Sequence, residues 1–113
     1  MQHGAKIVVI EAGKPYPLIV EAAARGADAT ILQAMLDRGA DVNAQDADGM
    51  TALMQTGVRG KSSNARLLLA HHANVAKKDR NGHTALWYAT NNESGSPDSR
   101  EQTIQLLRQA GAH

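Results

Sequence analysis

A repeat with a period of 33 residues constrains the fold of this chain more than any other feature of its sequence. Residues 39–54 read GADVNAQDADGMTALM and residues 72–87 read HANVAKKDRNGHTALW, with identical residues at 7 of the 16 aligned positions. Proteins with such periods stack one supersecondary unit on the next, so that neighbouring units share a continuous core. The sequence therefore predicts a stacked repeat architecture.

The composition indicates that the repeating unit is helical. Aromatic residues make up only 3% of the 113 residues, and much of the 42% hydrophobic content is Ala and Leu. Small and unbranched apolar side chains suit closely packed helices, whereas sandwiches and barrels depend on β-branched and aromatic residues. A chain of this length corresponds to one domain, and we expect an all-α repeat fold.

Charge, cysteine content and hydropathy exclude several functional classes. The formal net charge is +1, which is too balanced to attract nucleic acid or an acidic membrane by its field alone. The chain has no cysteine, which excludes disulfides, thiol nucleophiles and Cys-based zinc sites. Its longest early apolar run, Ile7–Ile10, is too short for a signal peptide or a membrane span. We expect a soluble, cytoplasmic protein.

The repeated rows carry a recognisable motif. Residues 48–54 read DGMTALM, residues 81–87 read NGHTALW, and residues 39–44 read GADVNA. These segments resemble the ankyrin repeat, in which a turn and a Thr-initiated helix are followed by a second, Leu-rich helix and a Gly-Ala-Asp turn. The resemblance implies an ankyrin-type solenoid of helix-turn-helix units joined by β-hairpin-like fingers.

The resemblance covers residues 16–113, and residues 1–15 are expected to form an N-terminal extension or a partial finger. In the last repeat the spacing to the closing Gly-Ala is six residues longer, which predicts an inter-helix insertion in the turn-rich stretch 91–100. We expect fingers at residues 42–51 (the first finger) and 75–84 (the second finger), which turn at Asp48-Gly49 and Asn81-Gly82. The expected repeats are about 16–46, 47–79 and 80–113.

Local signals predict where the helices begin and end. Thr51 and Thr84 are expected to cap first helices at about 52–58 and 85–91, and Ser62 or Ser63 to cap a second helix at about 62–71. The position after each second helix requires a left-handed residue. It is occupied by Gly39, His72 and Gly111. The inner faces of the second helices are expected to carry Ile31, Leu32, Met35 and Leu36, then Ala65, Leu68 and Leu69, and finally Ile104, Leu106 and Leu107.

Two interpretations of the N-terminal segment are open. Ile7 lies as far before Leu18 as Val42 lies before Leu53, so residues 6–17 could form a finger arm that turns at Gly13-Lys14. Alternatively, residues 6–10 could be a free edge strand that pairs with another chain.

Motifs for cofactors and catalysis are incomplete. Gly60-Lys61-Ser62 resembles the end of a phosphate-binding loop, but the required earlier glycine is replaced by Gln55. In the acidic stretch 41–49, a calcium loop would need a carboxylate at Ala44 and a glutamate at Gln55. No nucleophile–base pair emerges. We therefore expect a non-enzymatic protein with no cofactor and no metal.

The resemblance implies a protein–protein interaction module that binds another protein through its concave groove and finger tips. By position, the first finger offers Gln45, Ala47, Asp48 and Met50, the second offers Lys78, Arg80, Asn81 and His83, and the first helices add Val58, Arg59, Asn91 and Asn92. The first finger carries extra acidic residues and the second extra basic residues, so we expect a partner with an acidic patch facing the second finger.

Trp87 and Tyr88 are two of the three Trp and Tyr residues of the chain, and the position of Trp87 is usually His in the family that the rows resemble. We expect Trp87 mainly to fill the core, and the alternative is an exposed aromatic anchor in the groove. A dedicated inhibitor or immunity-type protein, and an oligomerising structural unit, are alternatives to a general interaction module. A monomer is favoured over a homo-oligomer.

Overall fold

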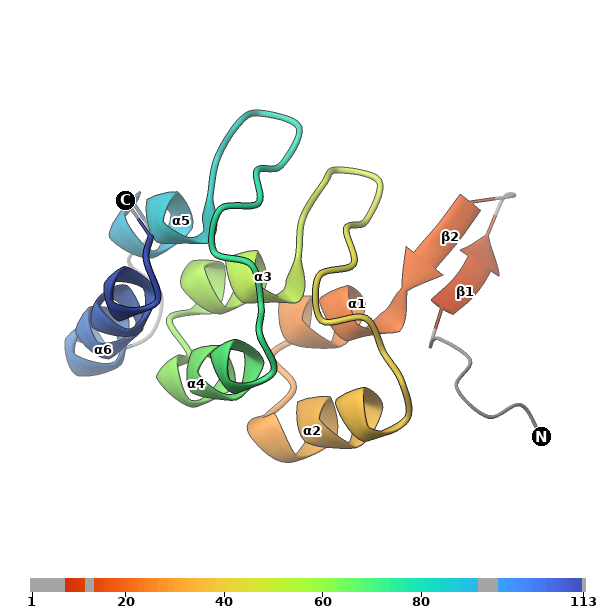
Figure 1. Cartoon of the computed structure of the whole chain (residues 1–113), viewed down its shortest axis with the longest axis horizontal. Helices are drawn as coiled ribbons and strands as arrows, with labels where there is room; N and C mark the ends of the chain where they lie inside the picture. Colours follow the sequence, from red (N-terminus) through yellow and green to blue (C-terminus); the bar gives the residue numbers. More distant parts are fainter. Residues whose placement is uncertain (1–7, 12–13, 92–95, 113) are drawn as a thin grey trace.

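The computed structural model describes residues 8–11, 14–91 and 96–112. Its helices form three antiparallel pairs, and the pairs stack side by side in two rows (Figure 1). The first row contains α1 (Leu18–Ala24), α3 (Ala52–Arg59) and α5 (Ala85–Asn91), and the second contains α2 (Ala29–Asp37), α4 (Ser62–Ala70) and α6 (Pro97–Gln109). This arrangement is the all-α stacked repeat that the 33-residue period predicted.

The local helix signals act as expected at several ends. The Thr51 hydroxyl accepts a hydrogen bond from the Met54 N–H at 3.2 Å, and the Thr84 hydroxyl accepts one from the Trp87 N–H at 3.3 Å. His72 adopts a left-handed φ of 67°, the conformation that Gly39 and Gly111 adopt at the equivalent positions. A Cβ atom makes that conformation unfavourable, so His72 is a strained substitute for glycine.

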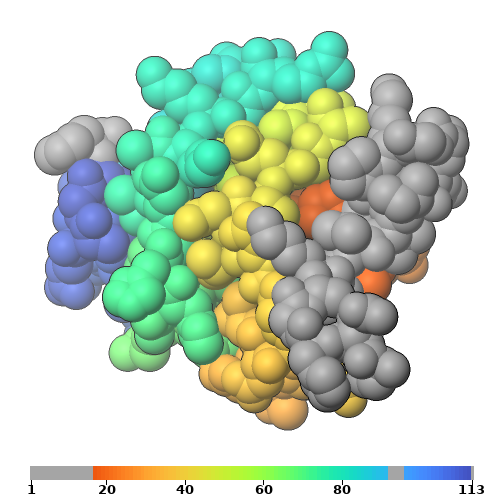
Figure 2. Space-filling model, turned by 45° about the vertical axis from the view of Figure 1, so that its right-hand side comes forward, coloured from red at the N-terminus to blue at the C-terminus, as the bar shows by residue number. Residues whose placement is uncertain are grey.

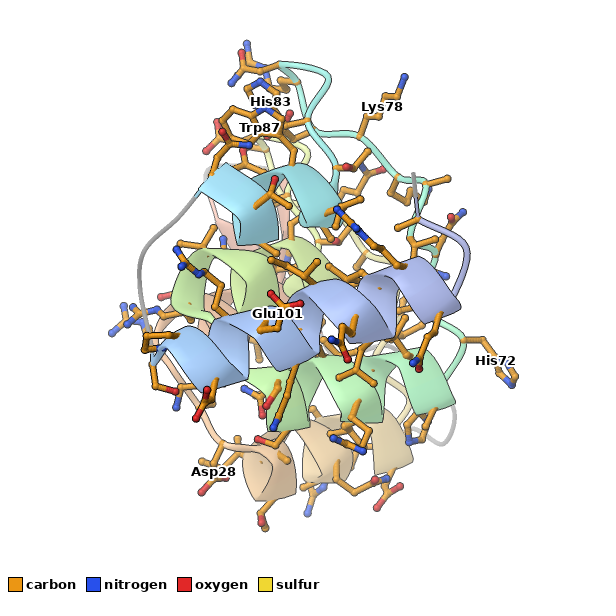
Figure 3. All side chains as sticks on the ribbon, turned by 90° about the vertical axis from the view of Figure 1, so that its left-hand side faces the viewer. Asp28, His72, Lys78, His83, Trp87 and Glu101 are labelled. Carbon is orange, nitrogen blue, oxygen red and sulfur yellow. The ribbon has the colours of Figure 1, made fainter. Side chains whose placement is uncertain are left out.

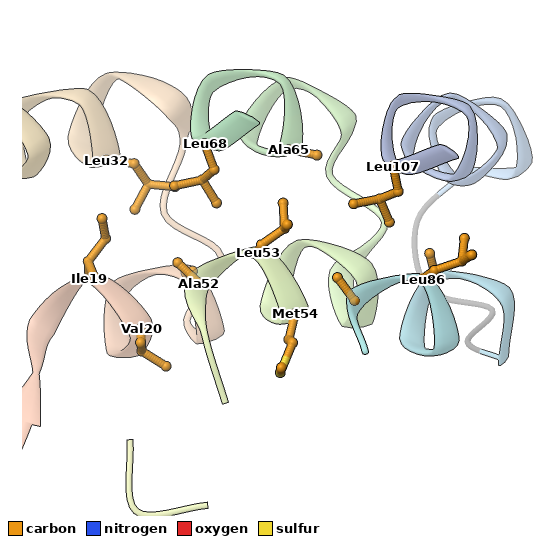
Figure 4. Close-up of a cluster of buried hydrophobic side chains, with 13 residues drawn as sticks. Ile19, Val20, Leu32, Ala52, Leu53, Met54, Ala65, Leu68, Leu86 and Leu107 are labelled. Atoms are coloured by element: carbon orange, nitrogen blue, oxygen red, sulfur yellow. The ribbon is translucent and has the colours of Figure 1, made fainter. Parts of the chain in front are cut away.

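The core lies between the two rows of helices (Figure 4). Leu53 of the first row and Leu32, Leu68 and Leu107 of the second row have almost no exposed surface. Alanines fill the places where the helices approach closely, and Ala52, Ala65, Ala85 and Ala89 are all buried. The shortage of aromatic residues is therefore a consequence of this close helix packing.

The prediction that Ile31 faces the core is wrong. Its side chain is 48% exposed, whereas Asn64, at the equivalent position of α4, is buried and donates from Nδ2 to the Ala27 carbonyl at 2.7 Å. The preceding repeat covers Asn64, but among the described residues no helix precedes α2 in its row. The burial of this position therefore depends on the neighbouring repeat.

The last repeat extends its second helix, because Pro97–Arg100 form an additional first turn of α6. Part of the predicted insertion is therefore helical, and residues 92–95 lie outside the described residues. This additional turn carries Ser99, whose hydroxyl donates to the Gly60 carbonyl and accepts from the Ser62 N–H at 3.3 Å. The prediction that Ser62 or Ser63 caps α4 is wrong, since the cap residue Lys61 makes no side-chain cap and Ser99 supplies the acceptor from the next repeat.

The N-terminal segment pairs within the chain. Strand β1 (Val8–Glu11) runs antiparallel to β2 (Lys14–Pro17), with Val8 opposite Pro17 and Glu11 opposite Lys14. This pairing supports the interpretation as a finger arm, although the expected turn residue Gly13 lies outside the described residues. Pro15 and Pro17 have no backbone N–H, which suits a strand with a single partner.

The two fingers lie side by side across one face of the molecule (Figure 2). Within the described residues, strands occur only in the β1–β2 pair, so the fingers are held by turns rather than by a ladder. In the first finger, the Asp46 N–H donates to the Met50 carbonyl at 3.0 Å. In the second, the Asp79 N–H donates to the His83 carbonyl at the same distance.

Candidate functional site

An aspartate organises the tip of each finger. Asp46 Oδ1 accepts hydrogen bonds from the Asp48 and Met50 N–H groups, each at 2.9 Å. In the second finger, Asp79 Oδ1 accepts from the Asn81 and His83 N–H groups at the same distance. Each carboxylate is the hydrogen-bond acceptor for N–H groups of its own turn, as the side chain of an Asx turn is. Both aspartates are therefore structural groups as well as charges.

The finger tips are also joined to each other. Gln45 Nε2 donates to the Gly49 carbonyl at 2.9 Å in its own finger and to the Lys78 carbonyl at 3.1 Å in the next. The Arg80 N–H donates to the Asp48 carbonyl at 3.0 Å, and the two side chains form an exposed ion pair at 3.7 Å. These links make the two tips one preorganised surface.

Three aromatic rings gather beside the second finger. The rings of His83 and Trp87 stack with centroids 3.6 Å apart and an interplanar angle of 2°, and Tyr88 meets the Trp87 ring edge-on at 5.1 Å. Figure 3 shows His83 and Trp87 together above α5. The edge-on contact of Tyr88 is one of the favoured geometries for aromatic pairs, whereas the His83–Trp87 pair is close to a face-to-face stack.

Trp87 is 41% exposed, so the expectation that it mainly fills the core is wrong and the alternative of an exposed aromatic is supported. Trp87 is the third residue of α5, and the third residues of α1 and α3 are Val20 and Met54. Those two are almost completely buried. A further first helix packs against α1 and against α3 on the side of the following repeat, whereas among the described residues no first helix follows α5.

Tyr88 connects this aromatic cluster to the finger, because its hydroxyl donates to Asp79 Oδ2. Burial and the neighbouring Asp79 carboxylate raise the pKa of Tyr88 to about 12. Burial alone would raise the pKa of Asp79, but the hydrogen bonds from the Tyr88 hydroxyl and from the His83 and Asn81 N–H groups outweigh it and lower that pKa below 3.8. At neutral pH the pair is a neutral phenol and an ionised carboxylate.

A hollow of about 370 Å³ opens between the finger tips and α5. The tip residues and one aromatic ring line it: Asp48, Met50, Asp79, Arg80, Asn81 and Tyr88. The predicted residues Asp48, Met50, Arg80 and Asn81 are thus brought together, with His83 and Trp87 beside them.

Other predicted residues lie elsewhere. Lys78 extends from the side of the second finger opposite to His83 and Trp87 (Figure 3). Arg59 donates from Nη2 to the Ala24 carbonyl at the end of α1. Asn91 is exposed at the end of α5 and donates to the Trp87 carbonyl at 2.8 Å. Val58, on α3, is half-buried, Ala47 is exposed at the tip of the first finger, and Asn92 lies outside the described residues.

Sequence reasoning missed the Tyr88–Asp79 hydrogen bond. The two residues lie nine positions apart in the sequence, and no motif signals the contact. The sequence offered one signal that Asp79 has a structural role: Asp46 occupies the same place in the motif one period earlier.

The described part of the chain contains neither a candidate metal site nor a candidate membrane-spanning helix. None of its groups of His, Cys, Asp and Glu side chains could hold a metal ion. In the same residues, no helix has the length and apolar character needed to cross a membrane.

Comparison with known proteins agrees with this geometry. A family model described as ankyrin repeats in three copies matches residues 19–113. The chain is also 38% identical over 73 residues to protein HOS4 of Saccharomyces cerevisiae. That alignment covers 64% of this chain but only 7% of the yeast protein. Two rows of paired helices, the Thr-capped first helices and the match over residues 19–113 place this chain in the ankyrin repeat family.

Proposed function

We propose that this chain is a non-catalytic interaction module that binds a partner protein through its concave surface and finger tips. Ankyrin repeats are generally protein-interaction modules, which supports the class of function. The observation that carries the proposal is the exposed Trp87 ring, which is held against His83 beside the hollow. Trp is one of the residue types most enriched at binding hot spots.

Preorganisation of the surface supports the same function. Gln45 and Arg80 tie the two finger tips together before any partner arrives. Binding then costs less conformational entropy than it would for mobile loops, so more of the contact energy becomes affinity. A binding role also explains why a large apolar ring is exposed in a protein with so few aromatic residues.

We further propose that the chain works as a monomer in the cytoplasm and that its partner is not a nucleic acid. The net charge of +1 supplies no general attraction for a polyanion. Size-exclusion chromatography with light scattering tests the monomer: a stable dimer would favour the oligomerising alternative.

The binding function is tested by affinity capture with the purified chain, followed by titration of each captured protein with purified components. Trp87→Ala should weaken binding about tenfold or more, as truncation of an aromatic hot spot does. Gln109→Ala serves as the control, because Gln109 is exposed on α6 and should leave the affinity unchanged.

The identity of the captured protein separates the remaining alternatives. A single enzyme or toxin that loses activity in the complex would favour the dedicated inhibitor. Equal affinities of the Trp87→Ala variant and the wild type for every captured protein would refute the assigned surface.

A further inference from the structure

The hollow between the finger tips has an excess of negative charge. Asp79 is only 9% exposed, and its hydrogen bonds keep it ionised. Its described partners are neutral donors: two backbone N–H groups and the Tyr88 hydroxyl. Asp48 adds a second carboxylate at the rim, and Arg80 offsets one of the two. The side chains that line the hollow therefore sum to one net negative charge.

The basic residues of the second finger do not reverse this charge. Lys78 points away from the hollow, on the far side of the finger (Figure 3). Lys77 Nζ lies 3.5 Å from Gln45 Oε1, and neither residue lines the hollow. Arg80 is the one basic residue of this finger at the hollow, and it is paired with Asp48. The charge that the sequence assigned to the second finger thus lies largely on another face.

The aromatic rings at the hollow also favour a positively charged ligand. Tyr88 lines the hollow, and the exposed Trp87 ring stands 5.1 Å from it. Aromatic faces attract cations, and Trp does so most strongly. Met50 adds an apolar surface against which the stem of a long side chain can pack.

We propose that this hollow receives a basic side chain of the partner protein, with arginine preferred over lysine, so that the partner presents a basic segment to the finger tips. The inference rests on the proposed function, since it names the chemistry of the partner at the same surface. A guanidinium group can bind the Asp48 carboxylate through two hydrogen bonds while its plane stacks on an aromatic ring. An ammonium group meets the carboxylate as a point charge without the paired geometry, and although an aromatic face attracts its charge it has no plane that can stack there.

A random dodecapeptide display library, selected on the immobilised full chain, tests the proposal without knowledge of the natural partner. Selected peptides are synthesised and titrated against the chain, with the fluorescence of Trp87, the single tryptophan, as the signal. The peptides should be enriched in arginine, and replacing that arginine by lysine should weaken binding severalfold.

Variants of the chain locate the contact. Asp48→Lys should weaken binding about tenfold, because it replaces an attraction by a repulsion at the rim of the hollow. Asp37→Lys makes the same change of net charge on the exposed side of α2 and should change the affinity less than twofold. A peptide with glutamate in place of its arginine should bind Asp48→Lys better than it binds the wild type.

The outcomes separate this inference from the proposed function. Selection of acidic peptides whose binding is weakened by Arg80→Glu but not by Asp48→Lys would overturn the inference and leave an interaction module. Equal effects of Asp48→Lys and Asp37→Lys would also overturn it. Titration calorimetry compares the wild type with Trp87→Ala, because this variant lacks the fluorophore. Peptides that bind equally well to both, or a library that yields no binder, would count against the assigned surface and the inference together.

Discussion

Gly57 lies where two helices of the first row approach closely, and its replacement by alanine sets two physical effects against each other. Gly57 is buried within α3, against α5. In a helix interior alanine is favoured over glycine by about 0.5–1 kcal/mol. If helix propensity decided the outcome, Gly57→Ala would stabilise the protein.

The packing predicts the opposite sign. A Cβ atom on Gly57 would lie 2.8 Å from the Ala85 carbonyl oxygen, 3.0 Å from the Ala89 nitrogen and 3.2 Å from the Tyr88 Cβ. Two of these atoms belong to the backbone of α5, so a side-chain rotation cannot relieve the contact. Overpacking of this kind typically costs 1–3 kcal/mol, sometimes more. We expect a net loss of about 1–2 kcal/mol in the free energy of unfolding.

Urea unfolding measures this difference. Circular dichroism at 222 nm follows the helices, and the fluorescence of Trp87 follows α5, the helix that the new methyl group pushes away. Ser63→Ala is the control, because Ser63 is exposed on α4 and gains helix propensity without a clash. It should be as stable as the wild type or slightly more stable.

A Gly57→Ala variant as stable as the wild type, with unchanged Trp87 fluorescence, would refute the reasoning. Such a result would mean that α3 and α5 can separate by a few tenths of an ångström at no cost, and that propensity outweighs packing here.

Three further predictions concern the core, the finger and the strained turn. Leu68→Ala, at a side chain with no exposed surface, should lower the unfolding free energy by about 2–5 kcal/mol, measured by urea denaturation. His72→Gly should raise it by about 1 kcal/mol because glycine adopts the φ of 67° without strain. Tyr88→Phe should cost about 1–2 kcal/mol at pH 7 through the lost hydrogen bond to Asp79. Because the pKa of Tyr88 is raised to about 12 in the folded protein, its contribution to stability is fully present below pH 10 and is lost as the pH rises toward about 12. The wild type should therefore lose stability across that interval more steeply than the Tyr88→Phe variant.

Features that depend on neighbours in the chain were predictable from the sequence. Thr51 and Thr84 cap the helices that begin one residue later, since an N-cap needs only its own first turn. His72 takes the left-handed conformation because the end of its helix requires it, whatever packs nearby. Four of the finger residues proposed from the sequence, Asp48, Met50, Arg80 and Asn81, line the same hollow because a fixed period brings equivalent positions to the same face, and their role in binding stays a prediction.

Features that depend on contacts between repeats were not predictable in this way. The cap of α4 comes from Ser99, 37 residues away in the chain. Lys78 points away from His83 and Trp87, so much of the positive charge that the second finger carries in the sequence lies outside the hollow.

The sequence by itself determined the architecture, because a 33-residue period with Ala-rich and Leu-rich helices can bury its apolar faces only by stacking. The tertiary structure decided which of those faces stay open. Val20 and Met54 are buried and Trp87 is exposed although all three hold the same place in the repeat. The exposure of a side chain at this place depends on whether a further repeat packs over it, and a pattern that is the same in every repeat cannot encode that difference.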